Sequence, residues 1–206
     1  RELIDHVGQY KDLKFPAQLT DAPEMVLRGG CVGIQKMEYL PGRGVYEYPY
    51  TPESFPWFYD KEQWIKYLDM LVENRMNSLY LWNGHPFASL VKLEEYPFAV
   101  EVDEETFKKN EEMFSFLTAE ADKRGIFVIQ MFYNILLSKP FAEHYGLKTQ
   151  DRNRPITPLV SDYTRKSVAA FIEKYPNVGL LACLGEAMDT YEDDVEWFTK
   201  TIIPGV

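Results

Sequence analysis

A carboxylate that could do acid–base chemistry ends the apolar run Val178-Gly-Leu-Leu-Ala-Cys-Leu-Gly-Glu186. The run is too short for a helix and is typical of a buried parallel strand. Flanked by Leu184, Ala187 and Met188, the Glu186 carboxyl would be desolvated, which raises its pKa. Such a group can protonate a leaving oxygen. Glu186 is therefore the candidate catalytic residue, and a solvated loop Glu that caps the next helix is the alternative.

Four uncharged hydrogen-bonding side chains lie at the ends of two further strand-like runs, 78–82 and 126–132. The carboxyl ends of parallel strands meet at one edge of a sheet, so these side chains should share that edge with Glu186. Amide and imidazole groups suit the hydroxyls of a sugar. The four candidate substrate-binding residues are Asn83, His85, Gln130 and Asn134. For His85, a satisfied turn histidine is an even alternative.

Aromatic side chains stand beside these polar ones. Trp82 and Tyr133 offer ring faces on which the C–H face of a sugar can pack, so both are candidate substrate-binding residues. Core packing is the alternative for Trp82, which lies inside a strand-like run. The loop 35–59 holds eight further aromatic residues, which also suit binding.

The sequence offers little for metal or nucleophilic chemistry. Its three histidines, His6, His85 and His144, show no H-E-x-x-H spacing, and no G-x-S-x-G occurs. Cys31 and Cys183 lie in apolar runs, where a free cysteine acts as a small hydrophobe. We therefore expect no metal and no cofactor.

The composition and net charge limit the classes of partner that the chain can bind. The chain has 206 residues, 46% of them hydrophobic and 15% aromatic, which is enough for one sizeable core. The net charge of -10 disfavours nucleic acid and anionic membranes. No stretch approaches the roughly 18 consecutive apolar residues of a membrane span. A carbohydrate is a more suitable partner than nucleic acid, and membrane insertion is not expected.

Strand-like and helical patterns alternate along the chain. Helices are expected at about 60–74, 103–125, 161–175 and 190–203, each after a strand-like run, which makes four βα units of an α/β fold. The loops after strands are long and those after helices short. This asymmetry is typical of (β/α)8 TIM barrels, whose active sites lie on one face.

Four βα units make half of such a barrel. We predict a linker or tail from an upstream domain at 1–27 and the N-terminal half of a TIM-barrel catalytic domain at 28–206. The remaining half would come from the same longer chain or from a second copy of this one. A doubly wound sheet is the alternative, but no G-x-G-x-x-G follows a strand.

Three segments resemble glycoside hydrolase family 20, the β-N-acetylhexosaminidases. Asp21-Ala-Pro-Glu-Met-Val-Leu-Arg28-Gly29 resembles the D-x-P-x-x-x-x-R-G segment before the first strand, and Arg75-Met-Asn-Ser-Leu-Tyr-Leu81 resembles the second strand. Leu184-Gly185-Glu186 resembles the end of the fourth strand, where the family has its acid/base Glu. The wider set of similar barrels includes the α-glucuronidases of families 67 and 115.

The resemblance implies an exo-glycosidase barrel in which Arg28 binds hydroxyls of the terminal sugar and Glu186 is the general acid. The family has an Asp before that Glu, which polarises the acetamido group of the substrate. Here the position is Gly185, which argues against chemistry assisted by an acetamido group. A second carboxylate would come from the missing half, or from a loop residue such as Glu38 or Glu47.

We therefore predict a glycoside hydrolase that acts on a terminal sugar of a poly- or oligosaccharide, in polysaccharide degradation, and is extracellular or periplasmic. The alternative is a carbohydrate-binding barrel domain without turnover. A carboxylate within roughly 5 to 10 Å of Glu186 would distinguish an enzyme from a binding domain.

Overall fold

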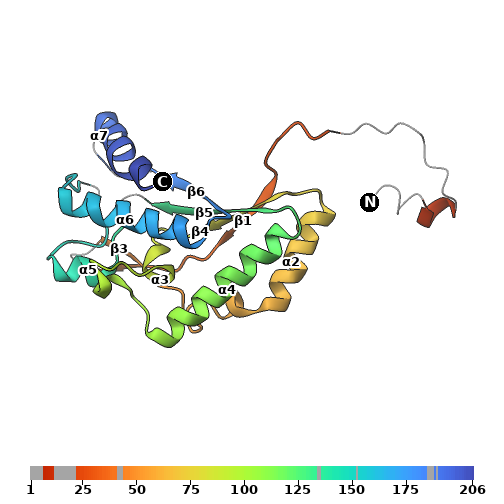
Figure 1. The fold of residues 1–206 in the computed structure, drawn as a ribbon, viewed down its shortest axis with the longest axis horizontal. Coiled ribbons are helices and arrows are strands. Elements are labelled where there is room, and N and C mark those ends of the chain that lie inside the picture. The colour runs from red at the N-terminus through yellow and green to blue at the C-terminus, as the bar shows by residue number, and fades with distance from the viewer. Residues whose placement is uncertain are drawn as a thin grey trace.

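The computed structural model describes residues 7–11, 22–40, 44–133, 136–151, 153–184, 188 and 190–206 (Figure 1). A parallel sheet has the strand order β1-β4-β5-β6. Its strands are β1 (Gly29–Gly33), β4 (Ser78–Trp82), β5 (Phe127–Tyr133) and β6 (Val178–Cys183). The longer helices are α2 (Lys61–Glu73), α4 (Glu104–Asp122), α6 (Pro158–Lys174) and α7 (Tyr191–Trp197). The prediction of an α/β fold with a parallel sheet is confirmed.

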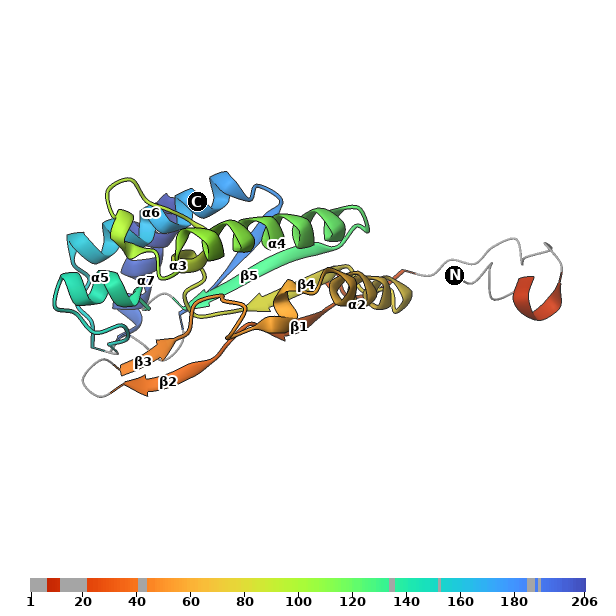
Figure 2. The ribbon, with the colours of Figure 1, turned by 90° about the horizontal axis from the view of Figure 1, so that it is seen from below.

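One face of the sheet is covered by helices. Leu79 and Leu81 of β4 point to this face and are fully buried, and their register partners in β5 include Val128, 1% exposed. The other face, which we call the open face, is more accessible: Cys31 is exposed and Leu181 is 42% exposed. Figure 2 shows α4 and α6 on the same side of the strands.

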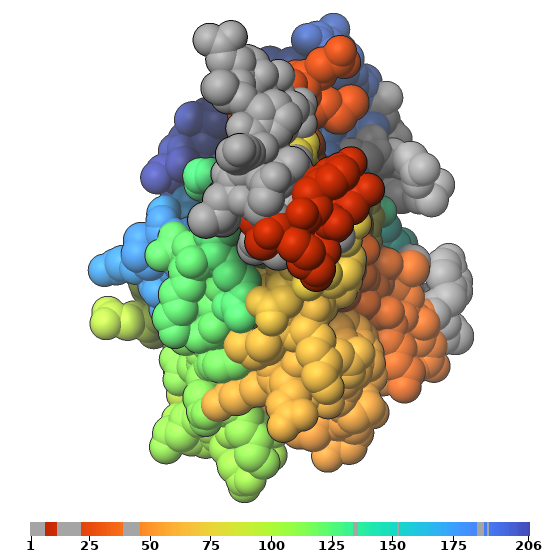
Figure 3. Space-filling view, turned by 90° about the vertical axis from the view of Figure 1, so that its right-hand side faces the viewer, coloured from red at the N-terminus to blue at the C-terminus, as the bar shows by residue number. Residues whose placement is uncertain are grey.

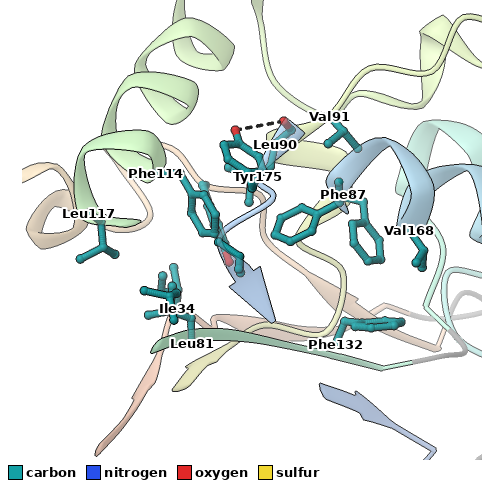
Figure 4. Packing of buried hydrophobic residues seen from close by; sticks show 14 of the residues in the cluster. Ile34, Leu81, Phe87, Leu90, Val91, Phe114, Leu117, Phe132, Val168 and Tyr175 are labelled. Carbon is teal, nitrogen blue, oxygen red and sulfur yellow. Dashed lines mark hydrogen bonds between the residues drawn. The ribbon is translucent and has the colours of Figure 1, made fainter. Parts of the chain in front are cut away.

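The hydrophobic core lies between the sheet and these helices. Phe114 of α4 stands 5.8 Å, between ring centroids, from Phe171 of α6, and Phe87 stands 5.1 Å from Phe132 of β5. Figure 4 shows Phe114 and Phe87 between the helices and the strands, together with Tyr175, whose hydroxyl donates to the Leu90 carbonyl at 3.4 Å. Burial of large aromatic and aliphatic side chains holds the layers together.

Local signals fix most helix boundaries. Asp60 caps α2 by accepting a hydrogen bond from the Gln63 amide at 3.0 Å, as its position predicts. Asp103 caps α4 in the same way, and Gly125, with φ +66°, follows its end. The predicted start of α6 at Ser161 was three residues late. The actual cap is Thr157, followed by Pro158 at the first helical position, where proline loses no hydrogen bond.

The long loops contain short elements that the predictions omitted. The predicted loop 35–59 holds an antiparallel hairpin of β2 (Met37–Leu40) and β3 (Gly44–Glu47), then the 3₁₀ turn η1 (Pro56–Tyr59). The loop after β4 holds α3 (Phe87–Leu90) and the 3₁₀ turn η2 (Pro97–Ala99), and the loop after β5 holds α5 (Lys139–His144). The helix predicted at 190–203 is α7 continued by a π turn (η3, Phe198–Ile202) and a 3₁₀ turn (η4, Ile203–Gly205).

Candidate active site

The carboxyl ends of β4, β5 and β6 lie side by side, because the strands are parallel and in register. Trp82 pairs with Met131, and Tyr133 with Cys183, across neighbouring strands. Glu186 follows the end of β6 by three residues and, like Asn134 after β5, lies outside the described residues. The structure therefore describes the edge on which Glu186 was predicted to lie, but not Glu186 itself.

Asn83 ties two strand ends together. It is 2% exposed, its Nδ2 donates to the Ile34 carbonyl at 2.7 Å, and its Oδ1 accepts from the His85 amide at 2.8 Å. Both ends of its amide are thus engaged by backbone groups. Asn83 lies at the predicted edge, where it fixes the turn after β4.

Glu47, from the end of the hairpin, reaches the same turn. Its two carboxylate oxygens accept hydrogen bonds from the Gln35 side-chain amide, at 2.8 Å, and from the Gly84 backbone amide. Glu47 is 8% exposed, and this burial raises the pKa of its carboxyl, an effect that the hydrogen bonds partly offset. A Cβ at residue 84 would overlap the Glu47 carboxylate and the Leu136 side chain, which explains the glycine.

His85 is a neutral imidazole in an aromatic setting. Its Nε2 lies 2.8 Å from the Tyr163 hydroxyl, and its ring packs edge-on against Phe87 at 5.6 Å. Burial lowers the pKa of His85 to about 3, so the ring is uncharged at neutral pH. This environment matches the satisfied turn histidine that was its alternative.

A second carboxylate, Glu101, lies partly buried in the loop between α3 and α4. Its oxygens accept from the Tyr46 hydroxyl, at 2.9 Å, and from the Lys139 backbone amide at the start of α5. Desolvation raises the pKa of the Glu101 carboxyl to about 7. Sequence reasoning missed Glu101, whose one signal is a single carboxylate between two valines, Val100 and Val102.

A small cavity separates the two carboxylates. It is lined by Glu47, His85, Glu101 and Thr149, among others, and holds about 10 Å³, roughly the room that one water needs. Three segments therefore meet around this polar cavity, at the carboxyl ends of the strands. They are the hairpin, the turn after β4 and the loop before α5.

Trp82 and Tyr133 form an aromatic pair at the ends of β4 and β5. Their ring centroids are 5.2 Å apart and their planes meet at 86°. Both side chains are half-buried and point to the open face, opposite to Leu81 and Phe132. This pair retains the accessibility that sugar stacking requires.

Gln130 and Arg28 lie elsewhere. Gln130 is fully buried on the helix-covered face, and its Nε2 donates to the Leu81 carbonyl at 3.1 Å. Arg28 precedes β1 and so lies at the amino ends of the strands, opposite to the predicted site. Its guanidinium donates to the carbonyls of Arg75 at 3.0 Å and Met25 at 2.6 Å. The structure thus brings neither side chain to the accessible part of the predicted site.

No group of three or more potential metal ligands occurs among the described residues. A search of the same residues for a helix that could cross a membrane found none.

Comparisons with known proteins show what this chain is similar to. No protein-family profile and no curated protein matches the chain. A solved structure does: a GH138 enzyme targeting pectin rhamnogalacturonan II has 82% sequence identity and a TM-score of 0.92. This chain is similar to one part of that GH138 enzyme. The match covers 99% of this chain and 24% of the enzyme.

The similarity agrees with the sequence analysis at the level of glycoside hydrolases. The narrower resemblance to family 20 has no support, because the enzyme that matches carries a different family number. The three motifs behind that resemblance were short, and the Arg28 segment lies at the amino edge of the sheet, where its side chain bonds backbone carbonyls.

Proposed function

We propose that the chain forms the first four strand–helix units of a (β/α)8 glycoside hydrolase domain that acts on the pectic glycan rhamnogalacturonan II, with Glu186 as general acid. The observation that carries the proposal is the 82% identity to the GH138 enzyme over 99% of this chain. The barrel assignment rests on the geometry of the described sheet, and the assignment of Glu186 rests on its place in the sequence, three residues after the end of β6.

The sheet supports the barrel part of the proposal. Its strand order, β1-β4-β5-β6, follows the sequence without reversal. Right-handed crossovers in such a sheet put all helices on one face, whereas a doubly wound sheet reverses and has helices on both. A one-sided parallel sheet with an apolar open face is what half of a closed barrel would present.

Within the site, we propose that Glu186 donates the proton to the leaving oxygen and that a sugar ring stacks on Trp82 and Tyr133. Asn134 stays a candidate for a hydroxyl contact. Asn83, His85 and Gln130 are assigned to the framework, because their polar atoms bond neighbouring groups of the protein. A polymeric pectic substrate favours an extracellular or periplasmic location.

One observation favours the second candidate, a carbohydrate-binding domain without turnover. Glu47 and Glu101 each have both oxygens engaged in hydrogen bonds. The Glu38 carboxylate accepts from the Tyr48 hydroxyl on the hairpin. Glycoside hydrolysis needs a second carboxylate about 5 to 10 Å from the acid, which on this proposal comes from the rest of the longer chain.

The test is turnover by the complete protein. Oligosaccharides of rhamnogalacturonan II would be offered to the parent, to Glu186→Gln and to Glu192→Gln, a matched change at an exposed Glu in the first turn of α7. We expect Glu186→Gln to lose about two to four orders of magnitude in rate and Glu192→Gln to stay within about twofold. Aryl glycosides with acidic leaving groups should restore much of the Glu186→Gln rate, since they depart without a proton.

Equal rates in the parent and Glu186→Gln would contradict the acid assignment. Glycan binding by calorimetry without turnover in any protein would establish the binding domain instead.

A further inference from the structure

The backbone of Gly84 lies between a buried carboxylate and the aromatic pair of Trp82 and Tyr133. Its N–H donates to the Glu47 carboxylate, and its carbonyl accepts a hydrogen bond from the Tyr133 amide at 2.9 Å. Trp82 precedes Gly84 by two residues, and its ring centroid lies 5.2 Å from that of Tyr133. The position of the aromatic pair therefore depends on where the backbone of Gly84 is held.

The Glu47 carboxylate is itself held in one orientation. Its other oxygen accepts from the side-chain amide of Gln35, which follows the end of β1 by two residues. Both of these bonds come from neutral N–H groups, and Glu47 is 8% exposed. A carboxylate buried in this way costs stability relative to an apolar side chain. Its cost indicates a role in geometry at the point where it bonds, the turn after β4.

The hairpin that carries Glu47 lies at the molecular surface. Met37, the register partner of Glu47 across the hairpin, is 55% exposed. Figure 3 shows the region of the hairpin, in orange, on the surface beside the segment 51–75. A two-stranded hairpin is marginally stable by itself in water, so its place depends on bonds to the rest of the protein. The bond from Gly84 to Glu47 therefore fixes the hairpin and the turn after β4 together.

We propose that Glu47 is a positioning residue for sugar binding, because its carboxylate holds the backbone of Gly84 and, through it, the aromatic pair of Trp82 and Tyr133. Glu47 is buried and both of its oxygens are bonded, so it acts on the sugar through these two rings and does not touch it. This role replaces that of a second catalytic carboxylate, for which the sequence made Glu47 a candidate. The proposal rests on the proposed function in taking the aromatic pair as the sugar-binding surface.

Two substitutions in the complete protein separate the reach of Glu47 from its charge. Glu47→Gln keeps the reach, so its amide oxygen can still accept from the Gly84 N–H. Glu47→Asp keeps the charge but is one methylene shorter, so the bond to Gly84 is lost. For oligosaccharides of rhamnogalacturonan II, we expect Glu47→Asp to raise KM about tenfold and Glu47→Gln about twofold, with kcat within about twofold in both. The control, Glu53→Asp at an exposed Glu, should leave KM within about twofold.

Gly84→Ala moves the same turn from the other side, because its Cβ would overlap the Glu47 carboxylate. It should therefore raise KM about as much as Glu47→Asp, and it tests the proposal even if Glu47→Asp does not fold. An unchanged KM in the variants that fold, at a lowered melting temperature, would make Glu47 an anchor of the hairpin alone and would overturn the proposal.

A double-mutant cycle with Trp82→Ala tests whether Glu47 acts through the aromatic pair. Positioning predicts that Glu47→Asp raises KM less than about twofold once Trp82 is removed, because most of the surface that it positions is gone. A merely structural role would give the same rise with and without Trp82. A tenfold rise in both backgrounds would therefore overturn the proposal.

Backbone amide exchange, measured by mass spectrometry, gives a readout that needs no substrate. Peptides that contain Gly84 and Tyr133 should exchange about tenfold faster in Glu47→Asp than in the parent, and at the parent rate in Glu53→Asp. Unchanged exchange in Glu47→Asp would overturn the proposal whether or not the parent is an enzyme.

The parent separates this proposal from the proposed function. If the parent binds the glycan without turnover, the Kd from calorimetry takes the place of KM in each comparison. A parent that neither binds nor hydrolyses the glycan would refute the proposed function and, with it, a role of Glu47 in sugar binding. A parent that binds the glycan, beside Glu47 variants that bind it equally well, would refute the positioning role alone.

Discussion

The two ends of the parallel sheet hold their polar groups in opposite ways. At the amino end, Arg28 and Asn77 donate to backbone carbonyls, with Asn77 Nδ2 2.9 Å from the Val26 carbonyl. At the carboxyl end, Glu47 and Glu101 are carboxylates withdrawn from water, held by neutral N–H and O–H groups.

This difference suggests that the amino end of the sheet stabilises the fold and that the carboxyl end carries the chemistry. A solvated guanidinium that bonds carbonyls stabilises the fold at little cost, whereas a buried carboxylate is costly and is tolerated where geometry matters more than stability. The carboxyl end of the sheet is therefore where we place the chemistry.

The largest effect should come from the titration of Glu101. Its pKa is about 7 in the folded protein against an ordinary 4.5, so its contribution to stability is complete below pH 4.5 and is lost as the pH rises through 7. At about 1.4 kcal/mol per pKa unit, the loss by pH 8 is about 3 kcal/mol. Thermal unfolding of the complete protein between about pH 4 and 8.5 should show this decline.

Glu101→Gln should flatten the decline, since an amide can accept from the Lys139 N–H and donate to the Tyr46 oxygen without a charge. The control is Glu94→Gln, a change at an exposed Glu, which should leave the pH dependence as it is. A decline that persists in Glu101→Gln would assign the titration to another group and weaken the contrast.

Gly84→Ala should cost about 2 kcal/mol. Its Cβ would overlap Glu47 and Leu136, so the turn after β4 must shift away from the hairpin. Gly33→Ala is the matched change, because a Cβ there meets nothing within 4 Å, and we expect less than about 0.5 kcal/mol. Melting temperatures of the two variants decide the matter, and similar values would show that the turn is not tightly packed.

Trp82→Ala should raise KM for the glycan about tenfold, which corresponds to about 1.4 kcal/mol of lost stacking. Tyr80, also half-buried and on the same face two residues earlier, provides the control, and Tyr80→Ala should change KM by less than about twofold. Steady-state kinetics of the complete protein measure both. If the two variants behaved alike, the pair of Trp82 and Tyr133 would have no special role.

Sequence patterns predicted the elements whose structure is set by neighbouring residues in the sequence. Apolar periodicity predicted a strand at 78–82, which is β4, and helices from about 60 and 103, which the structure caps with Asp60 and Asp103. The hairpin was not predicted because β2 and β3 have only four residues each, and two of the side chains of β3 bond to groups far away in the sequence. Glu47 reaches Gly84, and Tyr46 reaches Glu101, 55 positions away in the sequence.

For the candidate site, the sequence predicted which end of the strands its residues follow, and no more. The rule that parallel strands end on one side of a sheet placed Asn83, Trp82 and Tyr133 at the carboxyl ends of β4 and β5, where the structure has them. It does not say which face a side chain takes, and Gln130 took the covered face because its strand alternates Val128, Gln130, Phe132 inward. Arg28 was assigned from a motif, and a motif carries no information on which end of the strand its side chain serves.

The smallest effect, at the amino end, bears most directly on that assignment. Arg28→Lys removes the fork that bonds the carbonyls of Arg75 and Met25 while it keeps the charge. We expect a loss of about 1 kcal/mol in stability and no change in kcat/KM, because Arg28 lies across the length of β1 from the site. A fall in kcat/KM at an unchanged melting temperature would instead mean that Arg28 contacts the sugar, as the resemblance to family 20 implied, and the two ends of the sheet would no longer divide stability from chemistry.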